Sequence, residues 1–493
     1  MDTKYYIGID QGTTNMKAGL FDITGKLVKE ASHQFSMLRP EPGIVEQDPD
    51  EWWEALCEIL RDVLSEHSNI KVSALAFCSQ VNSHIFADSD GNALTRVITW
   101  QDLRPLKYVK GLNEKIARDQ AAYPKGFSVD ETALVARAEW IKKENPEIWE
   151  NTAYIFSPKD YLNMRLTGNA ASDALSSIGM VTEDGDNYLP YLDKLVPGVY
   201  SRLPKLIPFR SALGKIKKTG NTLLDACLTD TIVAEGTMDL FGNLYGSGAT
   251  NAGDAIEVTG TCEIVGSLSN TTTLVPGVCY FPKIDGLYVH AGPTKSGGAS
   301  QLWMCKVFGI DIKEFVELAE SVEPGADGLI FLPYLEGERA PLWDGTAKGV
   351  FFGLTGAHGK AHMCRAVMEG VAFSARHLAE EIDKASGYRA EHLQISGGSS
   401  QSDICCQIRS DILNRVIDRI QVNNSGLIGA TLIATVAAGD NEDMNAAAKA
   451  LVHVEKSFLP RNEYRKKYDN MYRIYRKLYE NLKECYEMAS GSK

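Results

Sequence analysis

"YYIGIDQGTTNMKAGLFD" (residues 5–22) is the stretch that decides the fold. An apolar run over residues 5–9 ends at Asp10, and a second apolar run begins at Ala18. This pattern predicts two strands, 5–9 and 18–22, joined by a tight bend. Gly12 lets backbone amides approach an anion, and Thr13 and Thr14 add hydroxyl donors suited to phosphate. Asp10 is placed to hold Mg²⁺ directly or through water. The alternative is a plain hairpin with a solvated carboxylate, and the motif alone does not decide between them.

A similar pattern returns in the second half of the chain. "AIEVTGTCEIVGSL" (255–268) again places a Gly-Thr bend between two apolar runs. The repeat indicates two halves of one fold, and 493 residues exceed what a single core usually holds. "GSGATNAGD" (246–254) is rich in small residues and is the natural hinge. We therefore predict two domains, 1–249 and 250–493.

Strand and helix signals alternate along the chain, which predicts the α/β class. Residues 48–67 have the spacing of an amphipathic helix, and 72–80 read as a buried strand. A buried helix is expected over 427–439. The tyrosines of 462–489 recur at helical spacing, which favours a long packed helix over a chemical role.

The bulk composition excludes several classes of partner. The formal charge of −13 argues against nucleic acid and anionic membranes, which favour basic patches. The ten cysteines form no Cys-x-x-Cys pair, and the N-terminus resembles no signal peptide. These features predict reduced thiols in a cytoplasmic protein.

Four further segments carry candidate chemistry. Asp239 lies at a predicted helix start in "AEGTMDLFG", where a carboxylate is either a cap or a general base. "ISGGSSQSD" (395–403) is either a turn that lies flat against a purine or an ordinary strand-to-helix connection. "SQVNSH" (79–84) and "TWQDLRP" (99–105) offer the amides, carboxylate and indole of a polyol pocket. No Gly-x-x-x-x-Gly-Lys-Ser/Thr, Gly-x-Ser-x-Gly or metal-spaced His pair occurs, which argues against a P-loop kinase, a serine hydrolase and a zinc enzyme.

Together and in this order, the segments resemble the FGGY carbohydrate kinase family of the actin-like ATPase superfamily. "GVFFGLTGAHGKAHMCRAVMEG" (349–370) fits the family's C-terminal signature at each defined position. "LVARAEWIKKEN" (134–145) fits the other signature in part, since Leu134 and Arg137 replace the usual small residue and lysine. The resemblance implies two ribonuclease-H-like domains with an interdomain cleft for ATP and sugar.

The resemblance also implies roles for individual residues. Asp239 would be the catalytic base, and Asp10 would organise Mg²⁺. Thr13, Thr14, Asn15, Lys17, Gly260, Thr261 and Gly298 would contact the phosphates of ATP, while Gly397, Gly398 and Ser402 would hold adenosine. The expected acceptor residues are Gln80, Asn82, Trp100 and Asp102.

The acceptor itself is less closely defined. Residues 80–83 read Gln-Val-Asn-Ser where xylulose kinases commonly have Gln-Met-His-Gly, and the Arg-Glu pair of glycerol kinases is missing after Gln80. The general segment pattern is nearest to the xylulokinase-like branch, so a ketopentose such as xylulose is the first expectation. Gluconate, a tetritol or glycerol are alternatives, as is an actin-like ATPase without sugar-kinase activity. A homodimer is also among the expected assembly states.

Overall fold

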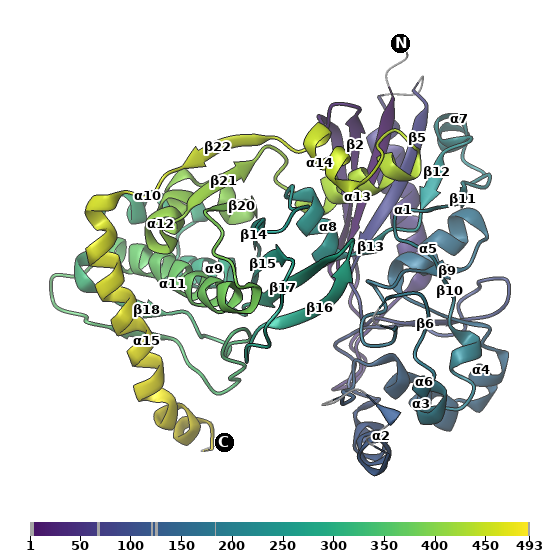
Figure 1. Cartoon of the computed structure of the whole chain (residues 1–493), viewed down its shortest axis with the longest axis horizontal. Coiled ribbons are helices and arrows are strands. Elements are labelled where there is room, and N and C mark those ends of the chain that lie inside the picture. Colours follow the sequence, from purple (N-terminus) through teal and green to yellow (C-terminus); the bar gives the residue numbers. More distant parts are fainter. Residues whose placement is uncertain (1–3, 67–69, 120–121, 124–126, 183, 492–493) are drawn as a thin grey trace. The chain divides into compact units, whose positions relative to one another are not determined.

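The computed structural model describes residues 4–66, 70–119, 122–123, 127–182 and 184–491 (Figure 1). The chain forms two compact units. Unit 1 consists of Met1–Gly246 with Gly426–Leu451, and unit 2 of Ser247–Ser425 with Val452–Lys493.

The strands of unit 1 form a sheet around the opening stretch. β1 (Tyr5–Gln11) pairs antiparallel with β2 (Asn15–Asp22) and parallel with β5 (Val72–Ser79). The sheet order is β11-β12-β5-β1-β2-β3, and β13 also pairs with β5. The other elements of unit 1 are β3 (Leu27–Gln34), β4 (Glu46–Gln47), α1 (Pro49–Leu64), β6 (Ile85–Ala87), β7 (Val97–Ile98), α2 (Leu106–Arg118), α3 (Leu134–Glu144), α4 (Pro146–Asn151), β8 (Tyr154–Phe156), α5 (Pro158–Thr167), β9 (Ala171–Ser172), α6 (Tyr191–Leu195), β10 (Lys205–Leu206), β11 (Ala212–Lys215), α7 (Thr222–Leu228), β12 (Ile232–Ala234), β13 (Thr237–Met238), α8 (Asp239–Gly246), α13 (Ser425–Ala437) and α14 (Met444–Leu451).

Unit 2 repeats the central arrangement of unit 1. β14 (Ala255–Thr259) pairs antiparallel with β15 (Glu263–Ser269) and parallel with β20 (His392–Gly397). The sheet order is β16-β17-β15-β14-β20-β21-β22. The other elements are β16 (Cys279–Ile284), β17 (Leu287–Pro293), α9 (Gly298–Phe308), α10 (Ile312–Glu320), β18 (Ile330–Leu332), β19 (Val350–Phe352), α11 (Lys360–Ser386), α12 (Asp403–Leu413), β21 (Val416–Ile420), β22 (Val454–Phe458) and α15 (Asn462–Ser490).

The two sheets share one topology. The order β3-β2-β1-β5-β12 in unit 1 corresponds strand for strand to β17-β15-β14-β20-β21 in unit 2, with the same antiparallel and parallel pairings. The α/β class and the two similar halves that the sequence predicts are therefore confirmed.

The predicted helices pack as their patterns indicate. Asp48 caps α1 by accepting a hydrogen bond from the Asp50 amide, and the apolar face that includes Trp52, Leu56 and Ile59 is buried in unit 1. In unit 2 the tyrosines of α15 contribute to the core around α11, and the hydroxyls of Tyr475 and Tyr334 lie 2.6 Å apart. Their role is packing, as expected.

One segment departs from the predicted division at residue 249. Gly426–Leu451 belongs to unit 1, although it follows most of unit 2 in the chain. Its helix α13 approaches β1 so closely that a Cβ at Gly8 would lie 2.0 Å from the Leu427 carbonyl oxygen. Similarly, a Cβ at Gly429 would lie 1.9 Å from the carbonyl oxygen of Gly242 in α8. Glycines on the facing backbones allow this packing, which no local sequence pattern reveals.

Among the described residues, no helix combines the length and the apolar character that crossing a membrane requires.

Candidate functional site

Asp10 and Asp239 lie at the same edge of the unit 1 sheet. Asp10 in β1 pairs with Cys78 in β5, and Cys78 pairs in turn with Thr237 in β13. Because these three strands are parallel, their carboxyl ends meet at one edge, where α/β proteins usually bind ligands. Asp239 follows β13 directly as the first residue of α8. Two carboxylates far apart in the sequence are thus brought together.

The surroundings of Asp239 make it a stronger base than an ordinary carboxylate. Burial and the nearby charge of Asp10 raise its pKa to about 6, against the lowering effect of a hydrogen bond from the Leu240 amide. The Asp239 side chain remains partly exposed to solvent. A carboxylate of this kind is mostly ionised at neutral pH and accepts a proton more readily than a typical aspartate.

Thr13 connects the phosphate bend to the predicted acceptor residues. Its hydroxyl donates to Gln80 Oε1 at 3.0 Å and accepts from Trp100 Nε1 at 2.9 Å. Ser83 Oγ also donates to Gln80 Oε1 and accepts from the Trp100 amide. These hydrogen bonds tie the Thr13 side chain to the expected acceptor residues. Its contact with phosphate stays a prediction.

The other residues of the first phosphate motif lie close by. Thr14 is exposed at the bend, and the Gly12 amide donates to the Asn15 carbonyl at 2.9 Å. Lys17 pairs with Asp10 across β1 and β2, so the two side chains project from the same face of the sheet. An ammonium beside a carboxylate at this edge suits a site for Mg²⁺ and phosphate.

Asn82 is held by a buried arginine. Asn82 has a left-handed backbone with φ 61°, and its carbonyl accepts from Arg137 Nη1. Arg137 is fully buried and donates also to His84 Nδ1 at 2.7 Å and to the Thr99 carbonyl at 2.8 Å. Since a guanidinium only donates, His84 Nδ1 is the acceptor and its proton lies on Nε2. Burial and the Arg137 charge hold the pKa of His84 well below its usual value, so the ring is neutral.

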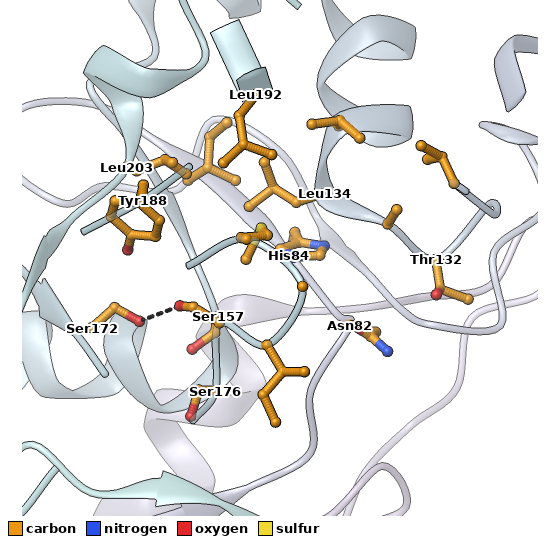
Figure 2. A pocket seen from close by; sticks show the side chains of 18 of the residues that line it. Asn82, His84, Thr132, Leu134, Ser157, Ser172, Ser176, Tyr188, Leu192 and Leu203 are labelled. Atoms are coloured by element: carbon orange, nitrogen blue, oxygen red, sulfur yellow. Dashed lines mark hydrogen bonds between the residues drawn. The ribbon is translucent and has the colours of Figure 1, made fainter. Parts of the chain in front are cut away.

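A cavity of about 190 Å³ adjoins Asn82 within unit 1. Figure 2 shows hydroxyl side chains, among them Ser157, Ser172 and Ser176, along one side of the cavity and leucines along the other. The Ser176 hydroxyl is buried and has no hydrogen-bond partner among the described residues. Apolar walls with a few convergent polar groups are typical of a site for a small ligand. The lining residues labelled in Figure 2 are Asn82, His84, Thr132, Leu134, Ser157, Ser172, Ser176, Tyr188, Leu192 and Leu203.

Asp102, the fourth expected acceptor residue, makes its contacts inside the protein. Its side chain is fully buried and accepts from the Val45 amide at 2.9 Å. Arg104 Nε donates to both of its oxygens, at 3.0 and 3.1 Å. Its carboxylate therefore anchors the loop that carries Trp100 and does not face an open surface.

A buried ion cluster supports the strand that leads to Asp239. Lys159 Nζ lies 2.6 Å from Asp160, 2.9 Å from Asp173 and 2.7 Å from Glu235, and all four side chains are buried. Burial lowers the pKa of Lys159, but the three carboxylates outweigh it and raise the pKa overall. Thr237, two residues before Asp239, donates to Asp173 at 3.1 Å. The cluster fixes the backbone on which the candidate base is mounted.

The second Gly-Thr bend and α9 meet in unit 2. The Gly298 amide donates to the Gly260 carbonyl at 2.8 Å, and the Ala299 amide to the Thr261 carbonyl at 3.1 Å. Gly260 and Thr261 are exposed. The structure thus brings together the predicted phosphate residues of this half, although the amides of Gly298 and Ala299 are occupied by the bend.

The predicted adenosine residues lie at the carboxyl end of β20. Gly397 has φ 90°, and a Cβ there would lie 2.0 Å from the Thr259 carbonyl oxygen. Gly398 has open space around its would-be Cβ. Ser402 caps α12 by accepting from the Cys405 amide at 3.5 Å. The backbone conformation and the close contact therefore require glycine at position 397, whereas Gly398 leaves room for a ligand. The Ser402 hydroxyl already accepts a hydrogen bond within the protein.

Sequence reasoning missed the residues that support this site. In the sequence, Arg137 stands out only because it departs from a family signature. That departure is the one local signal that could have indicated its supporting role. The Lys159 cluster unites residues separated by as many as 76 positions, so no local motif reveals it.

Known proteins resemble this chain in sequence and in fold. The profile of the N-terminal domain of the FGGY family of carbohydrate kinases matches residues 5–240, and that of the C-terminal domain matches residues 258–438. The chain is 28% identical over 502 residues to a xylulose kinase of Lactococcus lactis, with 97% of each chain covered. The crystal structure of ligand-bound xylulose kinase from Lactobacillus acidophilus superposes with a TM-score of 0.86 and 27% identity, covering 98% of this chain and 99% of that one. The crystal structure of gluconate kinase from the same organism gives 0.86 and 26%, covering 99% and 100%.

Proposed function

Because the chain belongs to the FGGY family of carbohydrate kinases, we propose that it phosphorylates a ketopentose such as xylulose, with Asp239 as the general base. The chain is an ATP-dependent sugar kinase, as its family and its full-length relatives indicate. The observation that carries the assignment of the base is the pairing of β1, β5 and β13, which brings Asp10 and Asp239 to one sheet edge.

The proposed reaction is a single displacement. The acceptor hydroxyl gives its proton to Asp239 as its oxygen attacks the γ-phosphorus of ATP, and the bond from that phosphorus to the β,γ-bridging oxygen breaks to release ADP. Phosphoryl transfer depends mostly on positioning and on stabilising charge. The raised pKa of Asp239 suits proton removal near neutral pH.

Asp10 fits a role in holding Mg²⁺. The cation is usually bound in proteins by one or two carboxylates together with waters and substrate phosphates. Asp10 provides hard carboxylate oxygens at the sheet edge, and no cluster of three or more metal-binding side chains occurs in the described parts of the chain. When bound, Mg²⁺ would neutralise charge on the ATP phosphates.

We place the acceptor beside Gln80, Asn82 and Trp100. The indole of Trp100 offers an apolar face to C–H groups, and the amides of Gln80 and Asn82 suit hydroxyls. The cavity next to Asn82 provides room for the carbons remote from the reacting hydroxyl. In unit 2, Gly260, Thr261 and Gly298 are proposed for the phosphates, and the open space at Gly398 supports adenosine binding there.

The test is ADP release from MgATP with xylulose, other ketopentoses, gluconate, tetritols and glycerol as acceptors. We expect strong turnover on xylulose or another ketopentose, lost in Asp239→Asn and kept in Asp90→Asn, which removes a charge from an exposed turn. Turnover on gluconate, a tetritol or glycerol alone would replace the acceptor and keep the base. ATP hydrolysis that needs no acceptor and survives Asp239→Asn would overturn the proposal.

All ten cysteines are free thiols, which supports a cytoplasmic location for this chemistry.

A further inference from the structure

Four arginines surround a small cavity in unit 2, between α11, α12 and α15. The cavity has a volume of about 90 Å³. Its lining consists of Arg376, Ala379, Glu380, Arg389, Leu413, Arg415 and Arg465. No step of the proposed kinase reaction uses these residues.

The cavity lies at the opposite edge of the sheet from the nucleotide residues. Arg389 precedes β20 and Arg415 precedes β21, so both lie at the amino ends of parallel strands. Gly397 and Gly398 lie at and just after the carboxyl end of β20. A strand of this length separates its ends by roughly 20 Å, so one phosphate cannot contact both places.

The carboxylates near the cavity are fewer than the arginines. Arg376 binds Glu380 at 2.9 Å and Asp469 at 2.8 Å, and Arg465 Nε binds the second oxygen of Asp469 at 2.7 Å. Arg415 pairs with Asp383. Three carboxylates thus pair with three of the four guanidinium groups, which leaves an excess of positive charge.

Arg389 is the arginine without a carboxylate among the described residues. Its Nη2 donates only to the carbonyls of Leu413 and Asn414, at 3.4 and 2.9 Å. Partial burial and the charges of Arg415, Arg465 and Arg376 lower the pKa of Arg389, with Asp383 opposing them. A guanidinium in such surroundings is stabilised by an added anion.

One guanidinium nitrogen of the lining residues has no hydrogen-bond acceptor. Arg465 Nη1 is buried and has no hydrogen-bond partner among the described residues. Glu380, the acidic side chain of the lining, is already engaged, because its second oxygen accepts from the Tyr472 hydroxyl at 2.8 Å. A buried N–H without an acceptor is costly, so these lining residues have an unmet demand for a hydrogen-bond acceptor.

We propose that this arginine cavity binds a phosphoryl group, either as inorganic phosphate or as the phosphate end of a small phosphate ester. The forked guanidinium matches the oxygens of phosphate better than a lysine would. The cavity of about 90 Å³ is large enough for a phosphoryl group. The Ala379 and Leu413 side chains close the remaining walls.

Calorimetric titration of the full-length protein with inorganic phosphate and, separately, with glycerol 3-phosphate tests the proposal. Ionic strength is held constant, because salt screens such contacts. The variants are Arg389→Gln and Arg465→Gln. The control is Arg473→Gln, because Arg473 is an exposed arginine in α15, the helix that also carries Arg465. We expect a binding event that weakens about tenfold or more in Arg389→Gln and Arg465→Gln and is unchanged in Arg473→Gln.

The two ligands separate the two sources of the phosphoryl group, since the tighter one identifies whether free phosphate or an ester is preferred. Phosphate bound equally by all four proteins would place it elsewhere and overturn the proposal, as would the absence of binding to the wild type. Arg389 is exposed and bonds only to carbonyls, so its variant is expected to fold, and circular dichroism checks this. Failure here would leave the kinase assignment intact, because the ADP assay reports it separately.

Discussion

Replacing Lys159 by methionine should strongly destabilise unit 1. The ammonium contacts three carboxylates at 2.6–2.9 Å, and it is fully buried. Methionine keeps most of the side-chain volume and removes the charge, so three buried carboxylates then face one another. Removing one partner of a buried ion pair typically costs about 3–5 kcal/mol.

Equilibrium unfolding in urea, followed by tryptophan fluorescence, measures this effect. For a unit of this size the loss corresponds to a fall of about 1–2 M in the urea midpoint. Lys215→Met is the matched control, because Lys215 lies 2.9 Å from Asp230 but both side chains are exposed. Exposed pairs contribute little, so the control should unfold near the wild-type midpoint. Equal midpoints for the two variants would refute the argument that the buried cluster supports the strand before Asp239.

Three further predictions concern activity. Activity at saturating substrates should rise with pH through about 6 and level off above, because Asp239 acts as a base only when it is ionised. One pH unit below this pKa the rate should fall to about a tenth. A flat pH profile from 5 to 7 would contradict the role of Asp239 as base. Gly397→Ala should raise the KM for ATP about tenfold or more, because the left-handed backbone is strained for alanine and the added Cβ would strike Thr259. The control is Gly439→Ala, which should not change this KM, because Gly439 is also left-handed but has open space around its Cβ position. Trp100→Phe removes the donor to Thr13 and should raise the KM for the acceptor about fivefold; a change confined to the KM for ATP would argue against this placement.

The sequence by itself determined the elements of the fold and the residue types of the site. The apolar runs around the Gly-Thr bends predicted both hairpins, and the helical spacing of 48–67 predicted the buried face of α1. These signals are local, since each depends on residues within a few positions of one another. Local motifs marked Asp10 and Asp239 as candidates, and the family resemblance then assigned their roles, because no spacing rule connects the two residues.

Only the tertiary structure decided which side chains meet. It turned Thr13 toward Gln80 and Trp100, buried Asp102 against Arg104, and returned Gly426–Leu451 to unit 1. It also assembled the Lys159 cluster and the arginine cavity from segments far apart in the chain. The physical reason is that hydrogen bonds and ion pairs form between neighbours in space. Strand pairing and helix packing, rather than sequence distance, determine those neighbours.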